Sequence, residues 1–121
     1  MNMEKVTDGE LTIVVAGPVG FGNNIYIVID RETGESAFID APGEAAANAE
    51  AAEFGGVRPS KILLTHSHGD HTSAIEGLKE AFGCKLYANP KEPWLKGGSI
   101  DVEVEHRDEV QVGNLVFRAI A

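Results

Sequence analysis

The sequence predicts an α/β layered domain built on a mixed β-sheet, and three observations lead to this fold class. Short apolar runs rich in β-branched residues occur along the whole chain. Two segments between them have the composition and spacing of helices. The strand-like runs come first and then alternate with the helical segments, an order that gives a sheet with both antiparallel and parallel strands.

Three strands of an antiparallel meander are predicted in the N-terminal third. Residues 11–16 are β-branched and apolar, residues 24–30 read Asn-Ile-Tyr-Ile-Val-Ile-Asp, and residues 36–40 form a shorter run. Such residues favour strands because they pack well on a pleated surface. The glycine-rich residues 17–22 are predicted to form a flexible loop between the first two strands, and residues 31–34 a turn.

Two helices are predicted in the middle of the chain. Residues 44–53 are rich in alanine, the best helix former, and Gly55-Gly56 ends the segment. Residues 72–82 carry apolar side chains at helical spacing, and Gly83 ends them. The side chains that define this second helix are Ala74, Ile75, Leu78, Ala81 and Phe82.

Further strands are predicted around and after the second helix. They are residues 61–65, 85–88, 102–105, 110–112 and 115–121. Asn89-Pro90 is predicted to begin a short helix, with asparagine as the cap and proline at the first position. The last apolar run ends without a turn or polar cap, so we expect the chain to stop inside a strand.

The composition is that of one soluble globular domain, residues 1–121. The chain has 10 basic and 19 acidic residues and a net charge of −9, which disfavours binding to nucleic-acid phosphates. No apolar run in the sequence approaches the roughly 20 residues that span a bilayer, so no membrane partner is expected. The N-terminus has no basic start followed by an apolar core, and Cys84 is the lone cysteine. We therefore expect a cytoplasmic location.

Three of the four histidines lie within six residues, in the run His66-Ser67-His68-Gly69-Asp70-His71. The run follows a buried strand and precedes a helix, which is where α/β sheets place ligands. His66 and His68 are two residues apart, so both imidazoles point the same way in an extended chain and can reach one metal ion. Imidazole and carboxylate ligands suit zinc, iron or manganese. The alternative is a capped loop, with Asp70 as a helix cap and incidental histidines.

Residues 65–71 resemble the His-x-His-x-Asp-His signature of the metallo-β-lactamase superfamily. The meander, residues 38–43, the alanine-rich helix and Tyr87-Ala88 also occur in the order typical of that family. The chain looks most similar to the glyoxalase II type of thioester hydrolase. This resemblance implies the N-terminal αβ half of an αββα sandwich, in which a mixed sheet carries helices on one face.

The resemblance also implies which residues form the site. His66 and His68 would hold one metal ion, and Asp70 and His71 a second, with Asp70 counted as the catalytic residue. Asp40 matches a family aspartate just behind the site, where it would orient a ligand; the alternative is a cap or turn residue. Zinc is the first expectation for the cofactor, one or two ions in a complete site, with iron or manganese as alternatives.

The implied function is hydrolysis of an ester, thioester or amide in a small-molecule substrate by metal-bound hydroxide. Family members have a second αβ half that supplies further ligands, and this sequence ends about where that half begins. We therefore expect a truncated hydrolase or one completed by a second chain. The alternative is a metal-binding or structural half-domain that forms a homodimer without catalysis. His106 is predicted to be a solvated turn residue, and Cys84 an inert buried thiol.

Overall fold

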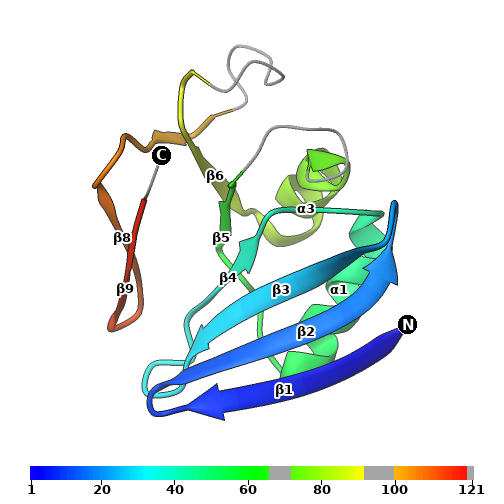
Figure 1. Ribbon diagram of the computed structural model, residues 1–121. Coiled ribbons are helices and arrows are strands. Elements are labelled where there is room, and N and C mark those ends of the chain that lie inside the picture. Colours follow the sequence, from blue (N-terminus) through cyan, green and yellow to red (C-terminus); the bar gives the residue numbers. More distant parts are fainter. Residues whose placement is uncertain (66–71, 92–99, 120–121) are drawn as a thin grey trace.

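The computed structural model describes residues 1–65, 72–91 and 100–119. Within these residues the chain forms a seven-stranded sheet, two helices and a separate two-stranded hairpin (Figure 1). The elements in chain order are β1 (Asn2–Asp8), β2 (Leu11–Val19), β3 (Asn23–Asp30), β4 (Ser36–Ile39), α1 (Ala45–Gly55), β5 (Lys61–Leu63), α3 (Ile75–Phe82), β6 (Lys85–Ala88), β7 (Val102–Glu103), β8 (Glu109–Val112) and β9 (Leu115–Arg118).

The large sheet joins a meander to a set of parallel strands, as the sequence predicts. Its order is β1-β2-β3-β4-β5-β6-β7; the pairs up to β4 are antiparallel and those from β4 onward are parallel. The register aligns Ile27, Phe38, Ile62 and Leu86 in one row across four strands. Directly paired residues share a face of the sheet. All four side chains are fully buried, so this row forms the centre of the core.

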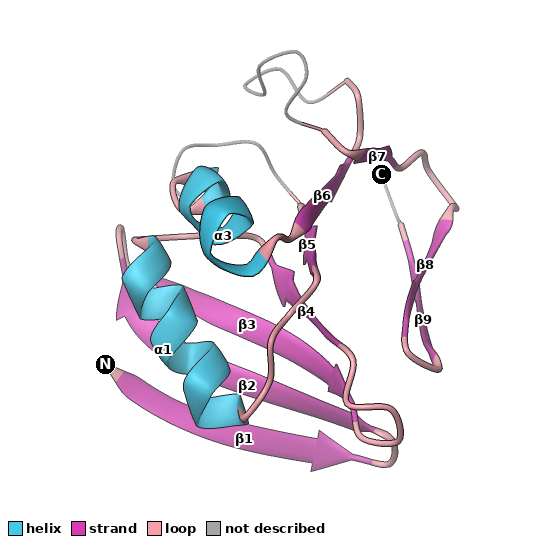
Figure 2. Cartoon of the chain, turned by 180° about the vertical axis from the view of Figure 1, so that it is seen from behind, coloured by secondary structure: helices cyan, strands magenta, loops and turns pink. Residues whose placement is uncertain are grey.

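The two faces of the sheet are covered by different elements. Helices α1 and α3 lie together on the face that carries the buried row, as predicted (Figure 2). Side chains one position along the strands point to the opposite face because strand residues alternate. There Val28 and Ala37 contact Val112 from the β8–β9 hairpin, which forms a second, smaller core.

Strand β1 is absent from the prediction, and its composition explains why. Six of its seven residues are exposed, and it forms the edge of the sheet beside β2. Its pairing with β2 runs through the backbone, from Asn2 opposite Gly17 to Asp8 opposite Leu11. A strand held mainly by its backbone leaves little hydrophobic pattern in the sequence.

The loop within the glycine-rich segment is shorter than predicted. β2 continues through Gly17 and Pro18 to Val19, with a register shift after Ala16. A side chain at position 17 would collide with Asn24 of the neighbouring strand, so the glycine allows close packing rather than loop freedom. The loop that remains, residues 20–22, carries Phe21 at its tip with 90% of its surface exposed.

Other element boundaries differ by a few residues. The second helix begins at Ile75 rather than Thr72. The predicted helix start at Asn89-Pro90 is a turn in which the Asn89 side-chain oxygen accepts the Lys91 backbone N–H, and residues 92–99 lie outside the described part of the chain. None of the helices in the described residues is long and apolar enough to cross a bilayer.

Candidate functional site

The candidate site lies where the parallel strands β4, β5 and β6 end at one edge of the sheet. Parallel strands bring their carboxyl ends together, and this edge is the usual ligand-binding position in open α/β sheets. The histidine signature follows β5 directly. His66, His68, Asp70 and His71 lie outside the residues that the structure describes. The structure therefore describes the site through the residues on either side of them.

Asp40 follows β4 and holds the residue that enters the signature. Its two carboxylate oxygens accept hydrogen bonds from the backbone N–H and the hydroxyl of Thr65, both at 2.6 Å. Its own backbone N–H donates to the Leu63 carbonyl at 2.9 Å. Asp40 is only 8% exposed, and no helix begins at it. The carboxylate thus ties the end of β4 to the chain directly before His66.

The residues that leave the signature are tied to the same stretch of chain. The hydroxyl of Ser73 donates to the Gly43 carbonyl at 2.7 Å. The backbone N–H of Ala74 donates to the Ala41 carbonyl at 2.9 Å. Residues 40–44, which we call the anchoring segment, therefore hold the chain on both sides of the signature.

The shape of the anchoring segment depends on two unusual backbone conformations. Asp40 has a φ of 61° and Gly43 a φ of 68°. The left-handed region costs a residue with a side chain roughly 1 kcal/mol, and at Asp40 the two hydrogen bonds from Thr65 offset that cost. At position 43 a Cβ atom would also lie 2.9 Å from the Cβ of Val19, so only glycine fits without displacing the end of β2.

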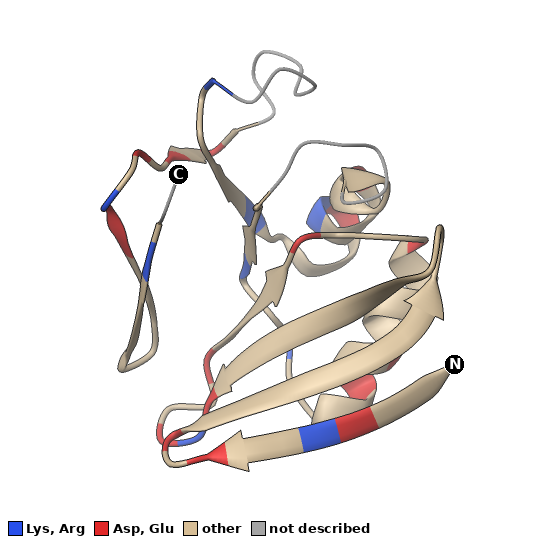
Figure 3. Cartoon of the chain, in the orientation of Figure 1, with Lys and Arg blue, Asp and Glu red and all other residues tan. Residues whose placement is uncertain are grey.

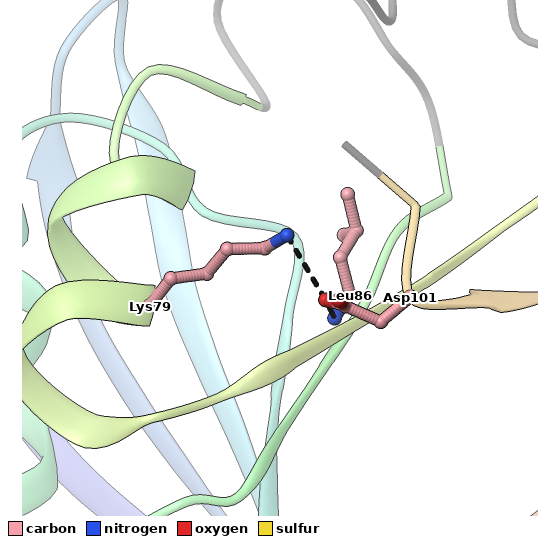
Figure 4. Close-up of polar contacts among 3 residues, drawn as sticks. All are labelled: Lys79, Leu86 and Asp101. Atoms are coloured by element: carbon pink, nitrogen blue, oxygen red, sulfur yellow. Dashed lines mark hydrogen bonds and ion pairs between the residues drawn. The ribbon is translucent and has the colours of Figure 1, made fainter. Parts of the chain in front are cut away.

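Helix α3, which follows the signature, is also fixed to the sheet, through β6 and the residue that precedes β7. The Asp101 carboxylate accepts the backbone N–H of Leu86 at 2.8 Å and forms an ion pair with Lys79 of α3 at 2.9 Å (Figure 4). The hydrogen bond from Leu86, followed by the contact with Lys79, holds the pKa of Asp101 below its usual range. The charged pair links α3, β6 and the start of β7.

A cavity of about 590 Å³ opens beside Thr65, between the ends of β4 to β6 and the β8–β9 hairpin. Its walls are mainly apolar, with a few polar groups, the composition typical of a small-molecule site. The polar groups in its lining are Thr65, Asn89, Glu105, His106 and Arg118. His106 is exposed in the segment before β8, in keeping with the predicted solvated turn.

Cys84 is an inert thiol, as the sequence predicts. Its side chain is buried, and its S–H donates to the Pro59 carbonyl at 3.1 Å. Burial raises the pKa of the thiol to about 11. The group is therefore protonated near neutral pH and is not a nucleophile.

Sequence reasoning missed the residues that hold the signature in place. Thr65 was noted only as the residue before it, and neither Ser73 nor Asn48 was given a role. Their partners lie 25, 30 and 6 residues away in sequence, contacts that no local pattern reveals. One signal was available at Asn48, since asparagine is a poor helix former placed in the interior of an alanine-rich helix.

The fold and the position of the signature define one αβ half of a layered αββα domain. A sequence profile of the metallo-beta-lactamase superfamily matches residues 17–112. The chain therefore belongs to the metallo-beta-lactamase superfamily.

Relatives within this family agree in sequence and in structure. The chain is 40% identical over 95 residues to a hydroxyacylglutathione hydrolase of Rhodopseudomonas palustris strain BisB5, and 44% identical over 91 residues to one of a Chelativorans species. These matches cover 78% and 75% of this chain but only 36% and 35% of the relatives. The chain thus spans about a third of their length.

Solved structures show the same fold at lower sequence identity. The subclass B3 metallo-beta-lactamase BJP-1 of Bradyrhizobium japonicum superposes with a TM-score of 0.72 at 21% identity, over 90% of this chain and 48% of that protein. ETHE1 from Myxococcus xanthus gives a TM-score of 0.62 at 24% identity, over 98% of this chain and 47% of that protein. At these identities the likeness establishes the fold alone.

Proposed function

We propose that the chain is the N-terminal, metal-binding half of a metal-dependent hydrolase. The observation that carries this proposal is the anchoring segment, which holds the chain on both sides of a histidine-rich signature at the carboxyl edge of the sheet. A metal site requires ligands fixed in geometry, and groups behind the ligands supply that fixation. A capped loop with incidental histidines needs no such double attachment.

The donor atoms in the signature fit a divalent metal. His66, His68 and His71 offer imidazole nitrogens and Asp70 a carboxylate, a set that suits zinc first and iron or manganese next. We assign His66 and His68 to one ion, and Asp70 and His71 to a second. A bound metal supplies Lewis acidity, which polarises a scissile carbonyl and lowers the pKa of water.

The chain's own residues position these ligands. In this proposal Asp40 fixes the backbone at Thr65, the residue directly before the signature, and it does so before any metal arrives. Ser73 and Ala74 fix the exit from the signature. Asp70, the carboxylate within the signature, is proposed as the catalytic residue. Preorganisation of this kind lowers the entropic cost of assembling a site.

The substrate class follows from the relatives. The curated relatives are named hydroxyacylglutathione hydrolases, enzymes whose name describes cleavage of a glutathione thioester. We propose a small-molecule ester, thioester or amide, with a thioester first. The net charge of −9 makes a polyanionic nucleic acid an unfavourable partner. A cytoplasmic location is part of the same proposal and rests on the lone cysteine.

A complete site would need a second αβ half on the open face of the sheet. Figures 1 and 2 show the β8–β9 hairpin over only one end of this face. Beyond it Val6 and Tyr26 remain 53% and 41% exposed. By the strand register both side chains lie on the face opposite the helices, where a second half would pack. We propose that a continuation of the chain or a second copy covers it.

A metal-binding half-domain that forms a homodimer without catalysis is the second candidate, and the uncovered face favours it equally. Native mass spectrometry of the zinc-loaded chain, followed by a free-thiol assay with an S-acylglutathione thioester, separates the two. A zinc-loaded species that releases thiol, and loses this activity in His68→Ala, supports the hydrolase. A zinc-loaded dimer without turnover supports the half-domain. A chain that binds no zinc contradicts both.

A further inference from the structure

Asn48 places a buried amide in a helix that otherwise consists mainly of alanine. It lies on α1 with no exposed surface. Its side-chain NH₂ donates two hydrogen bonds, to the Pro42 carbonyl at 2.8 Å and to the Glu44 carbonyl at 2.9 Å. Both acceptors belong to the anchoring segment. Most of the neighbouring helical residues are alanines, which would bury no polar atom at this position.

The carbonyl groups of the anchoring segment are shared between Asn48 and the residues that leave the signature. Those of residues 42 and 44 accept from Asn48. Those of residues 41 and 43 accept from Ala74 and Ser73. The donors alternate along the chain, so the segment is held between α1 and the start of α3.

The oxygen of the Asn48 amide is buried and has no hydrogen-bond partner among the residues that the structure describes. A buried, unpaired acceptor is destabilising. Rotating the amide would not help, because only its NH₂ group can face two carbonyl oxygens. A leucine, which has the same branching, would avoid the unpaired oxygen, but it could not donate to the segment. The amide therefore holds residues 42–44 in place with two hydrogen bonds, although it buries an unpaired oxygen.

We infer that Asn48 is a positioning residue for the histidine signature. Its amide fixes residues 42 and 44, and the residues between and beside them hold Thr65, Ser73 and Ala74. Asn48 thus acts on the signature through the anchoring segment, without touching it. The inference rests on the proposed function, because it assigns the signature a geometry that matters for metal binding.

The test compares Asn48→Leu with Val14→Ala. Asn48→Leu keeps the number and branching of the side-chain heavy atoms and removes both donors. Val14 is fully buried and packs at the other end of α1, near Gly55, so Val14→Ala disturbs the same core away from the anchoring segment. Three quantities are measured for each: the zinc dissociation constant by chelator competition, the absorption spectrum of the cobalt-substituted chain, and the midpoint of thermal unfolding.

Asn48→Leu is expected to weaken zinc binding about 3- to 10-fold, less than the roughly 10- to 100-fold typical of groups that contact a ligand directly. The cobalt spectrum should change, and the thermal midpoint should fall as well, because the buried Pro42 carbonyl loses its donor. Val14→Ala should lower the midpoint and leave zinc affinity and spectrum unchanged. Wild-type zinc affinity in Asn48→Leu, or equal weakening in Val14→Ala, would overturn the inference.

Hydrogen exchange gives a readout that does not depend on metal. In the metal-free chain Asn48→Leu should accelerate exchange of the backbone amides of Thr65 and Ala74, whose acceptors lie in the anchoring segment. Unchanged exchange at both amides would contradict the inference by itself. A wild-type chain that binds no zinc contradicts the proposed function instead, so the two failures are distinguishable.

Discussion

Two buried aspartates, Asp30 and Asp40, stand at opposite ends of the sheet and use the same chemistry. Asp30 ends β3, and Asp40 follows β4, which runs antiparallel to it. Each carboxylate accepts one backbone N–H from a distant segment, from Asn114 at 2.7 Å and from Thr65 at 2.6 Å respectively. Each also accepts a threonine hydroxyl, from Thr33 or again from Thr65.

The two aspartates differ in what they hold. Asp30 fixes the turn of the β8–β9 hairpin, where the Gly113 N–H also donates to Glu35 and the Asn114 side chain to Glu32. Figure 3 shows further acidic segments at the turns of this end of the sheet. Asp40 fixes the entry to the histidine signature. A buried carboxylate that accepts backbone hydrogen bonds therefore does not by itself indicate a functional site. Its role depends on which segment of the chain it holds.

The largest expected difference between the two ends is in metal affinity. Asp40→Ala releases Thr65 and is expected to weaken zinc binding roughly 10- to 100-fold, the range for groups that orient ligands. Asp30→Ala releases the hairpin turn and should leave zinc affinity unchanged, although it lowers the unfolding midpoint. Isothermal titration with zinc measures both variants. Equal loss of affinity at the two positions would show that Asp40 acts only through general stability.

Glycine replacements separate the two ends by a second route. Gly43 and Gly113 have φ values of 68° and 60°, and a Cβ atom at either would collide with a neighbour. Gly43→Ala and Gly113→Ala should each lower the free energy of unfolding by about 1–3 kcal/mol. Only Gly43→Ala should also weaken zinc binding. Urea unfolding and zinc competition on the same preparations give both values, and a zinc effect from Gly113→Ala would break the distinction.

Acid titration tests the Asp30 end alone. The hydrogen bond from the Asn114 N–H, the largest cause, holds the pKa of Asp30 below the ordinary 3.8. A lowered folded pKa adds stability that is fully present above the unfolded pKa and is lost as pH falls through the folded value. The wild type should therefore lose stability steeply below about pH 4, and Asp30→Asn less steeply. Parallel urea midpoints from pH 2 to 6 for both proteins would contradict this.

The smallest effects are expected from the exposed side-chain donors at each end. Ser73→Ala removes the bond to the Gly43 carbonyl, and Asn114→Ala removes the bond to Glu32. Each loss should cost about 0.5–1.5 kcal/mol of stability. Ser73→Ala should in addition raise the zinc dissociation constant by roughly twofold. A larger zinc effect in Asn114→Ala than in Ser73→Ala would argue against the anchoring segment.

Prediction from the sequence succeeded where the pattern is local and failed where contacts are distant. The β-branched run in residues 24–30 and the alanine-rich run each reflect the local preference of one element, so β3 and α1 were found within two residues. β1 was missed because its exposed side chains carry no pattern. The hydrogen bonds of the anchoring segment were not predicted, because Asp40 and Thr65, like Gly43 and Ser73, are distant in sequence and only the folded chain brings them near.

In the candidate site, too, the local motif was predicted and the distant contacts were not. The histidine signature is a local motif and was identified from its order of residues, with a strand before it and a helix after it. The hydrogen bonds that hold it join residues up to 33 positions apart. The similarity in sequence extends over 78% of this chain, which supports the family assignment. It covers only 36% of the length of the relative.

The central claim is that the signature held by the anchoring segment is a metal centre. Its most direct test is the zinc content of the wild type and of His66→Ala, His68→Ala and His106→Ala, after loading with zinc and exhaustive dialysis against metal-free buffer. The wild type and His106→Ala should retain at least one zinc ion per chain, while His66→Ala and His68→Ala should lose most of theirs. Equal zinc content in all four proteins would contradict the claim.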